Sequence, residues 1–279
     1  MPNPTGQTPP PDAPNPEPAL RVNVLTTFPE LFGDQPPAPL AVSIPGRARA
    51  AGLLDLHATN LRDFTTSKHG KTDDRPFGGG PGMVMSCQPI ADAVAHAESQ
   101  SPIPATRIYL TPQGQPLTQE LARELATKQH LVILCGHYEG IDERVIEHLA
   151  PIEISLGDYI LSAGELGAIV LIDAITRLLP GVLGHADAAA QDSFAGLPTH
   201  DPDGTPLPPK IVKKWADELG LTETPKLLDC PHYTRPREWE GRAVPEVLFG
   251  GDHLAVAKWR LEQQAQRTRD RRPDLLSED

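Results

Sequence analysis

The stretch Ser155 to Asp173, SLGDYILSAGELGAIVLID, decides the fold because it joins an apolar strand pattern to an apolar helix pattern through a glycine-broken middle. Its glycines stand at positions 157, 164 and 167. The spacing of Ser162 and Glu165 is that of a capping box, S-x-x-E, which predicts that the helix begins there. The helix is expected to run to Leu179, because a proline and a glycine follow that residue.

Three glycine-containing loops are predicted at one edge of a sheet. The strand RIYLT is followed by Pro112-Gln113-Gly114, the strand LVILC by Gly136 to Gly140, and the strand EISL by Gly157 to Gly164. In a parallel sheet these loops emerge together at the carboxyl ends of the strands, where ligands of open α/β sheets bind. One such turn is often merely tight, but three in succession favour a pocket whose backbone a ligand can approach closely.

The third loop is expected to form an exposed wall between a buried strand and a buried helix. Its backbone groups, together with Tyr159 and Leu161, are suited to a flat heterocycle, which such sites hold by hydrogen bonds and apolar contacts. The alternative is that Tyr159 and Leu161 serve packing alone.

The sequence upstream alternates strand and helix patterns. Strands are expected at RVNVLT and LDLHATN, and helices near residues 38–53, 88–98, 117–129 and 142–149. Strands separated by helices imply right-handed crossovers and a mostly parallel sheet covered on both faces. We therefore predict an α/β domain over residues 20–187. The run Phe77 to Gly82, FGGGPG, lacks the Lys-Ser/Thr pair of a P-loop and is expected to be an ordered functional loop.

Composition limits the class of protein. Residues 1–19 are rich in proline and poor in apolar side chains, so we expect a disordered tail. The start resembles no signal peptide, and no stretch approaches the roughly 20 apolar residues that span a bilayer, so we expect a soluble, cytoplasmic protein without a membrane partner. Three cysteines without a CxxC pair fit a reducing compartment. The net charge of -12 argues against diffuse nucleic-acid binding but permits a local basic patch.

The last third of the chain is expected to hold a linker and a small helical domain. Residues 188–227 are predicted as an interdomain linker with an insertion, because Ala195 to Lys210 is rich in proline and glycine. Residues 228–279 are predicted to fold into helices. Lys258 to Arg272 is strongly basic and reads either as a phosphate-contacting patch or as a solvated amphipathic helix.

Several motifs together carry a family resemblance. They are DDRPFGGGPGM, LTPQG, LCGHYEGIDERV, SLGDYILSAGEL, LIDAITRLLPGVLG and LLDCPHYTRP with WEG and VPEVLFGG. In this order, from Arg21 to Leu276, they resemble the bacterial tRNA (guanine-37, N1)-methyltransferases of the SPOUT class. The resemblance implies a homodimer, a C-terminal deep trefoil knot within the α/β domain, and S-adenosyl-L-methionine as methyl donor.

The resemblance also implies site residues. The knot loops of the family match cofactor-binding positions Tyr109, Leu110, Thr111, Pro112, Gly136, Tyr138, Glu139, Leu156, Gly157, Asp158, Tyr159, Ile160, Leu161 and Gly164. Asp192 matches the general base and Arg177 the arginine that stabilises charge on guanine. Asp192 capping a turn and Arg177 serving a helix dipole are the structural alternatives.

The implied partner is tRNA with guanosine at position 37, contacted by the C-terminal domain of one subunit over the cofactor site of the other. A Mg²⁺ requirement is implied as well, but no acidic cluster has recognisable ligand spacing, so no metal ligand is assigned. Cys230 and His232 are weak candidates for metal ligands, because only two such residues lie close together in the sequence. The insertion is expected to be mobile without RNA.

Ala163, Gly167 and His137 depart from the family pattern, which commonly has glycine, proline and arginine there. Two other readings stay open. One is a knotted enzyme that methylates another RNA position, and the other is a non-catalytic RNA-binding protein of the same fold.

Overall fold

The computed structural model of the protein describes residues 20–183 and 192–276. The chain divides into two compact units, Met1–Leu183 and Gly184–Asp279, and each is described by itself. The predicted tail over residues 1–19 and the predicted boundary between residues 187 and 188 lie outside the described residues. No described helix is long and apolar enough to span a membrane.

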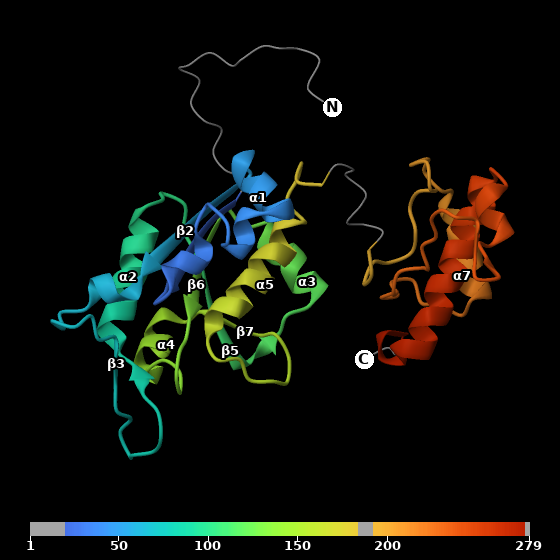
Figure 1. Ribbon diagram of the computed structural model, residues 1–279. Helices are drawn as coiled ribbons and strands as arrows, with labels where there is room; N and C mark the ends of the chain where they lie inside the picture. The colour runs from blue at the N-terminus through green and yellow to red at the C-terminus, as the bar shows by residue number, and fades with distance from the viewer. Residues whose placement is uncertain (1–19, 184–191, 277–279) are drawn as a thin grey trace, which may run out of the picture. The chain divides into compact units, whose positions relative to one another are not determined.

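The first unit is built on a five-stranded sheet (Figure 1), in which the strand order is β2-β1-β6-β5-β7 and each pairing is parallel. Its strands are β1 (Leu20–Thr26), β2 (Leu54–Asn60), β5 (Thr106–Pro116), β6 (His130–Cys135) and β7 (Ile152–Ser155). The predicted α/β class with a mostly parallel sheet is confirmed.

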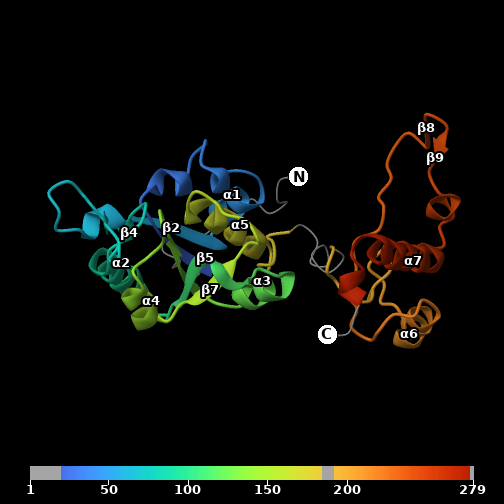
Figure 2. The same ribbon diagram turned by 90° about the horizontal axis from the view of Figure 1, so that it is seen from below.

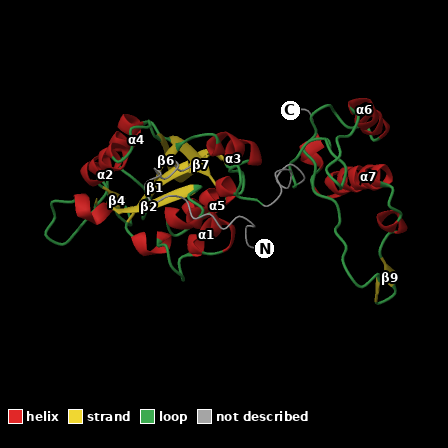
Figure 3. Cartoon of the chain, turned by 90° about the horizontal axis from the view of Figure 1, so that it is seen from above, coloured by secondary structure: helices red, strands yellow, loops and turns green. Residues whose placement is uncertain are grey.

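Helices cover both faces of this sheet (Figure 3). One face packs against α1 (Ser43–Ala50), α3 (Gln119–Ala126) and α5 (Gly164–Thr176), and the other against α2 (Cys87–Ser99) and α4 (Glu143–Leu149). Strand β6 is buried along its whole length, with alternate side chains in the two clusters. Burial on both sides explains why this strand reads as an unbroken apolar run.

Strand β5 is longer than the expected RIYLT, because it leaves β7 and then returns to it. Leu110 and Gln115 both pair with Ile154, so residues 111–114 are looped out between two paired stretches. Gly114 lies at the return, where an added Cβ atom would come within 2.4 Å of the backbone carbon of Glu153. Backbone atoms cannot yield at that distance, so this position requires glycine.

The start of α5 differs from the predicted capping box. The helix begins at Gly164, its N-cap is Ala163, and the cap makes no side-chain hydrogen bond. Glu165 is instead buried, with 3% of its surface exposed, and its carboxylate accepts hydrogen bonds from the first strand and the β6 loop. The regular helix ends at Thr176, before the expected Leu179. Long-range contacts to Glu165 have replaced the local cap that the spacing suggested.

Short elements complete the first unit. They are the 3-10 turns η1 (Pro29–Phe32), η2 (Pro39–Ala41) and η3 (Leu61–Phe64), and the hairpin strands β3 (Asp73–Asp74) and β4 (Val84–Met85). The glycine-rich run connects β3 to β4, and Phe77 within it is 99% exposed.

The second unit contains α6 (Pro209–Glu218), α7 (His253–Arg271), the hairpin β8 (Glu238–Trp239) and β9 (Arg242–Ala243), and the turns η5 (Glu246–Phe249) and η6 (Pro273–Leu276) (Figure 2). Its core joins α6 to α7 through Leu207, Val212, Trp215, Leu227, Ala257 and Leu261. The described part of the expected linker, residues 192–227, therefore packs as part of this unit, because its apolar residues find partners on α7.

Candidate functional site

The three glycine-containing loops meet in one pocket at the carboxyl edge of the sheet, with a volume of about 390 Å³. Its lining comes from the loop after Leu110, from Gly136 to Gly140 after β6, and from the segment between β7 and α5. The predicted pocket is thus present, and its size is that of sites for small molecules.

The lining agrees closely with the residues expected from sequence. Of the expected cofactor positions, Asp158 alone is absent from the lining. The lining also includes residues of the three predicted loops, namely Gln113, His137, Gly140, Ser162 and Ala163, and three residues that sequence reasoning missed, Ile154, Ser155 and Gly167. For Ser155 the available signal was its position next to Leu156. Ile154 and Gly167 face the pocket only because a strand and a helix pack there.

Two of the glycines are explained by the backbone, Gly164 by close approach and Gly157 by its conformation. A Cβ atom on Gly164 would lie 2.8 Å from the Cα atom of Cys135, so α5 begins directly against the end of β6. Gly157 has a φ angle of 140°, a conformation that other residues rarely adopt. The Gly164 amide also donates a hydrogen bond of 2.9 Å to the Gly136 carbonyl. Two pocket walls that are distant in sequence are thereby joined.

The wall after β7 is open to solvent. Tyr159 is 55% exposed and Ile160 is 80% exposed. The Tyr159 hydroxyl donates to the Leu156 carbonyl at 3.3 Å. Packing alone therefore does not account for Tyr159. Leu161 is half-buried, so part of its surface also faces solvent. This wall can cover a flat ligand with one aromatic and one aliphatic side chain.

A buried polar cluster joins the pocket to β1. His137 Nε2 lies 2.7 Å from Glu165 Oε1 and 3.2 Å from Thr27 Oγ1, and the Thr26 hydroxyl donates to Glu165 Oε1 at 2.5 Å. Burial raises the pKa of Glu165, but the hydrogen bonds from His137 and Thr26 outweigh it and hold that pKa below its usual range. Because a carboxylate only accepts hydrogen bonds, His137 carries its proton on Nε2.

The cysteines do not provide a nucleophile. Burial raises the pKa values of the Cys87, Cys135 and Cys230 thiols, so each favours the protonated form. The thiolate is the reactive form of cysteine. A covalent mechanism through these residues is therefore disfavoured.

The two expected catalytic residues lie in different units. Arg177 is half-buried and forms the C-cap of α5, where a cation also favours the helix dipole. Asp192 lies in the second unit, beyond residues 184–191. Its carbonyl accepts a hydrogen bond from the amide of Ala195 at 3.2 Å, which closes a turn, and Ala195 pairs with Leu227. The turn is thus fixed to the core of the second unit.

One candidate metal group occurs among the described residues. Ligand atoms of Asp229, Cys230 and His232 lie within 4.8 Å of one another. Asp229 accepts hydrogen bonds from the Cys230 amide at 2.7 Å and from His232 at 2.8 Å, and these bonds account for the arrangement without an ion. The group lies in the second unit and does not line the pocket.

Comparisons with known proteins identify the family of this chain. A family model described as tRNA (Guanine-1)-methyltransferase TrmD matches residues 20–278. A tRNA (guanine-N(1)-)-methyltransferase of Pseudomonas fluorescens is 48% identical over 257 residues, which cover 92% of this chain and 90% of the relative. The enzyme of the same name from Ruminiclostridium cellulolyticum is 45% identical over 260 residues, covering 92% and 97%. The chain therefore belongs to the tRNA (guanine-N1)-methyltransferase family.

Proposed function

We propose that this methyltransferase moves a methyl group from S-adenosyl-L-methionine to N1 of guanosine 37 in tRNA. The observation that carries the proposal is the pocket made by three glycine-containing loops at the carboxyl edge of the sheet, in a chain of this family. Ligands of parallel α/β sheets bind at that edge.

The pocket residues fit such a donor. The volume of about 390 Å³ is within the range of small-molecule sites, and Gly136, Gly157 and Gly164 bring backbone groups to its surface. Burial raises the pKa of the Tyr109 hydroxyl, so that pocket group stays neutral. When bound, S-adenosyl-L-methionine supplies an electrophilic methyl group on a sulfonium.

The reaction needs a base on the acceptor side. Guanine N1 carries a proton at neutral pH, so that proton must leave as the bond from N1 to the methyl carbon forms and the bond from sulfur to that carbon breaks. We assign the proton to the Asp192 carboxylate. We assign to Arg177 the stabilisation of negative charge that develops on guanine O6, for which a guanidinium is well suited.

We further propose that the first unit is knotted. Residues 111–114 leave the sheet and rejoin it beside β7, while the segment after β7 closes onto the β6 loop through the Gly164 amide and the Ala163–His137 bridge. Two loops that close onto neighbouring strands and loops in this way support the deep trefoil knot that the resemblance implies. An experimental electron-density map showing the two segments uncrossed would refute it.

The proposed homodimer is supported by an apolar surface on α5. Leu166 is 56% exposed and Val170 is 51% exposed, and their spacing of four residues places them on one face of the helix. In the proposed dimer, Asp192 of one subunit serves the pocket of the other. A second copy of the chain would remove this apolar face from water.

The double change Leu166→Asp and Val170→Asp is expected to convert a dimer into monomers at micromolar concentration, because unpaired carboxylates are costly to bury. Sedimentation equilibrium measures the change. Val42→Asp, at a residue that is 48% exposed, is the matched control and should stay dimeric. A double variant that remains a dimer would place the interface elsewhere.

The position of methylation is tested with tRNA transcripts. We expect methyl transfer to a transcript with guanosine at position 37 and a loss of transfer of at least about 100-fold when adenosine replaces it, since adenine lacks O6 and the N1 proton that the proposed site recognises. Mass mapping of nuclease fragments locates the methyl group. Transfer to another position would favour the alternative knotted enzyme, and no transfer at all would favour an RNA-binding protein.

RNA contact is proposed for the second unit. The basic stretch forms most of α7, whose Ala257 and Leu261 face the core, so it is an amphipathic helix that leaves cationic side chains at the surface. Such cations suit phosphate contacts. Mg²⁺ stays an expectation from the resemblance, and we assign it no ligands.

A further inference from the structure

The loop after β6 is held to two neighbouring segments by its backbone. The Glu139 amide donates to the Met83 carbonyl at 3.1 Å, and the Gly136 carbonyl accepts from the Gly164 amide at 2.9 Å. Tyr138 has a φ angle of 58°, in the left-handed region that costs energy for a non-glycine residue. A loop in this conformation needs additional contacts to keep it in place.

The His137 side chain supplies such contacts. Only 11% of it is exposed, and it joins three segments: its own loop, Thr27 after β1, and Glu165 in the first turn of α5. The centre of the Phe28 ring lies 5.4 Å from that of the imidazole, and the Arg62 guanidinium lies over the Phe28 ring. The imidazole is therefore held tightly on the sheet side of the pocket.

The Glu165 carboxylate depends on its hydrogen bond with His137. It is almost fully buried and needs donors, and it receives them from Thr26 and His137. Both bonds go to Oε1, so without His137 the buried carboxylate keeps the Thr26 bond but loses a donor that it cannot replace from water, which favours a shift of the loop or of the helix start. Either shift changes the separation between the two pocket walls.

We propose that His137 is a positioning residue for the methyl donor, which fixes the wall 136–140 relative to the wall 156–164 through Glu165. This inference rests on the proposed function, because it takes the pocket to be the site of S-adenosyl-L-methionine. In this role His137 sets the affinity for the donor and has no part in removing the proton from guanine.

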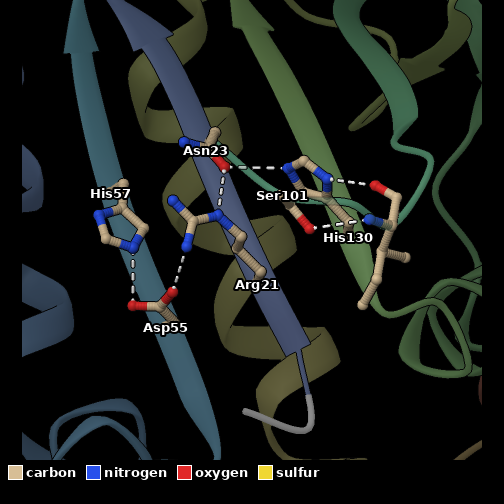
Figure 4. A network of polar contacts seen from close by, with 7 residues as sticks. Arg21, Asn23, Asp55, His57, Ser101 and His130 are labelled. Carbon is tan, nitrogen blue, oxygen red and sulfur yellow. Dashed lines mark hydrogen bonds and ion pairs between the residues drawn. The ribbon is translucent and has the colours of Figure 1, made fainter. Parts of the chain in front are cut away.

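A general loss of stability is the competing explanation, and His130 provides a matched control. His130 is also buried, at 1% exposure, and bonds Asn23 Oδ1 and the Ile103 carbonyl at 3.0 Å each. It begins β6, at the opposite end of the strand from the pocket, and belongs to the polar network with Arg21, Asp55 and His57 (Figure 4). His130→Ala should destabilise the fold without moving the pocket walls.

The experiment is calorimetric titration of the full chain with S-adenosyl-L-methionine, well below the unfolding temperature of each variant. His137→Ala is expected to raise the Kd about 10- to 100-fold, because the two walls that hold the donor are then no longer preorganised at the separation that it needs. His137→Gln, which retains an N–H donor at similar reach, should restore the Kd to within about threefold. At saturating donor, kcat for His137→Ala should stay within about threefold of wild type.

Three results would overturn the inference: an unchanged Kd for His137→Ala, an equal rise for His130→Ala, or no rescue by His137→Gln. A wild-type protein that takes up no S-adenosyl-L-methionine would instead refute the proposed function, and this inference with it. The two failures are therefore distinguishable in the wild-type titration alone.

Discussion

Asp192→Asn is expected to lower kcat for methyl transfer by about 10²- to 10⁴-fold, the usual contribution of a positioned general base. The amide has nearly the shape of the carboxylate but cannot accept the N1 proton. The turn at Asp192 is closed by its backbone carbonyl and fixed by Ala195, so the substitution should leave the second unit folded. Single-turnover methylation with saturating donor and tRNA measures the chemical step.

Two matched variants define the outcome. Asp217→Asn, on the exposed side of α6 with 63% exposure, should have full activity. Arg177→Lys keeps a cation at the end of α5, so it should retain activity if the arginine serves only the helix dipole. It should lose about 10²-fold or more if a guanidinium stabilises guanine O6. An Asp192→Asn enzyme with wild-type turnover would remove Asp192 from the mechanism.

Gly114→Ala is expected to destabilise the first unit by about 3 kcal/mol or more, at the upper end of overpacking effects. The new Cβ atom would lie 2.4 Å from the backbone of both Glu153 and Ile154, where β5 returns to β7. Relief requires the two strands to separate at the base of the pocket. Denaturant unfolding followed by circular dichroism gives the change in free energy of unfolding.

Gly33→Ala is the control for this effect within the same unit. Its added Cβ atom would meet the Glu30 carbonyl oxygen at 3.6 Å and Ala38 at 3.8 Å, which are ordinary contacts, so stability should change by less than about 0.5 kcal/mol. A Gly114→Ala protein that unfolds with the wild-type midpoint would show that the return of β5 to β7 is less crowded than the structure indicates.

The longest strand shows where local patterns stop being informative. RIYLT is expected as a strand because isoleucine, tyrosine and threonine favour strands, whereas the following residues contain Pro112, Gly114 and Pro116 and resemble a loop. The structure includes them in β5, because the chain pairs with β7 a second time after the register shift. Pairing with a distant strand has overridden local propensity.

The site shows the same division. The loops that line the pocket could be placed from sequence, since glycines after apolar strands mark the carboxyl edge of a parallel sheet. The role of Glu165 could not, because the capping-box spacing favoured a local cap, while the structure bonds it to Thr26, 139 positions away. Likewise, the apolar residues between the prolines of 195–210 resembled a linker until α7 supplied their partners.

Local chemistry thus sufficed for the order of strands and helices, the parallel sheet and the edge that carries the pocket, because hydrophobic periodicity and turn residues act over a few neighbouring positions. Folding in three dimensions was needed to bury Glu165 beside His137, to make Gly114 indispensable and to join residues 195–227 to the second unit. Each of these depends on burial and hydrogen bonding between segments far apart in the chain, whose energies no local pattern contains.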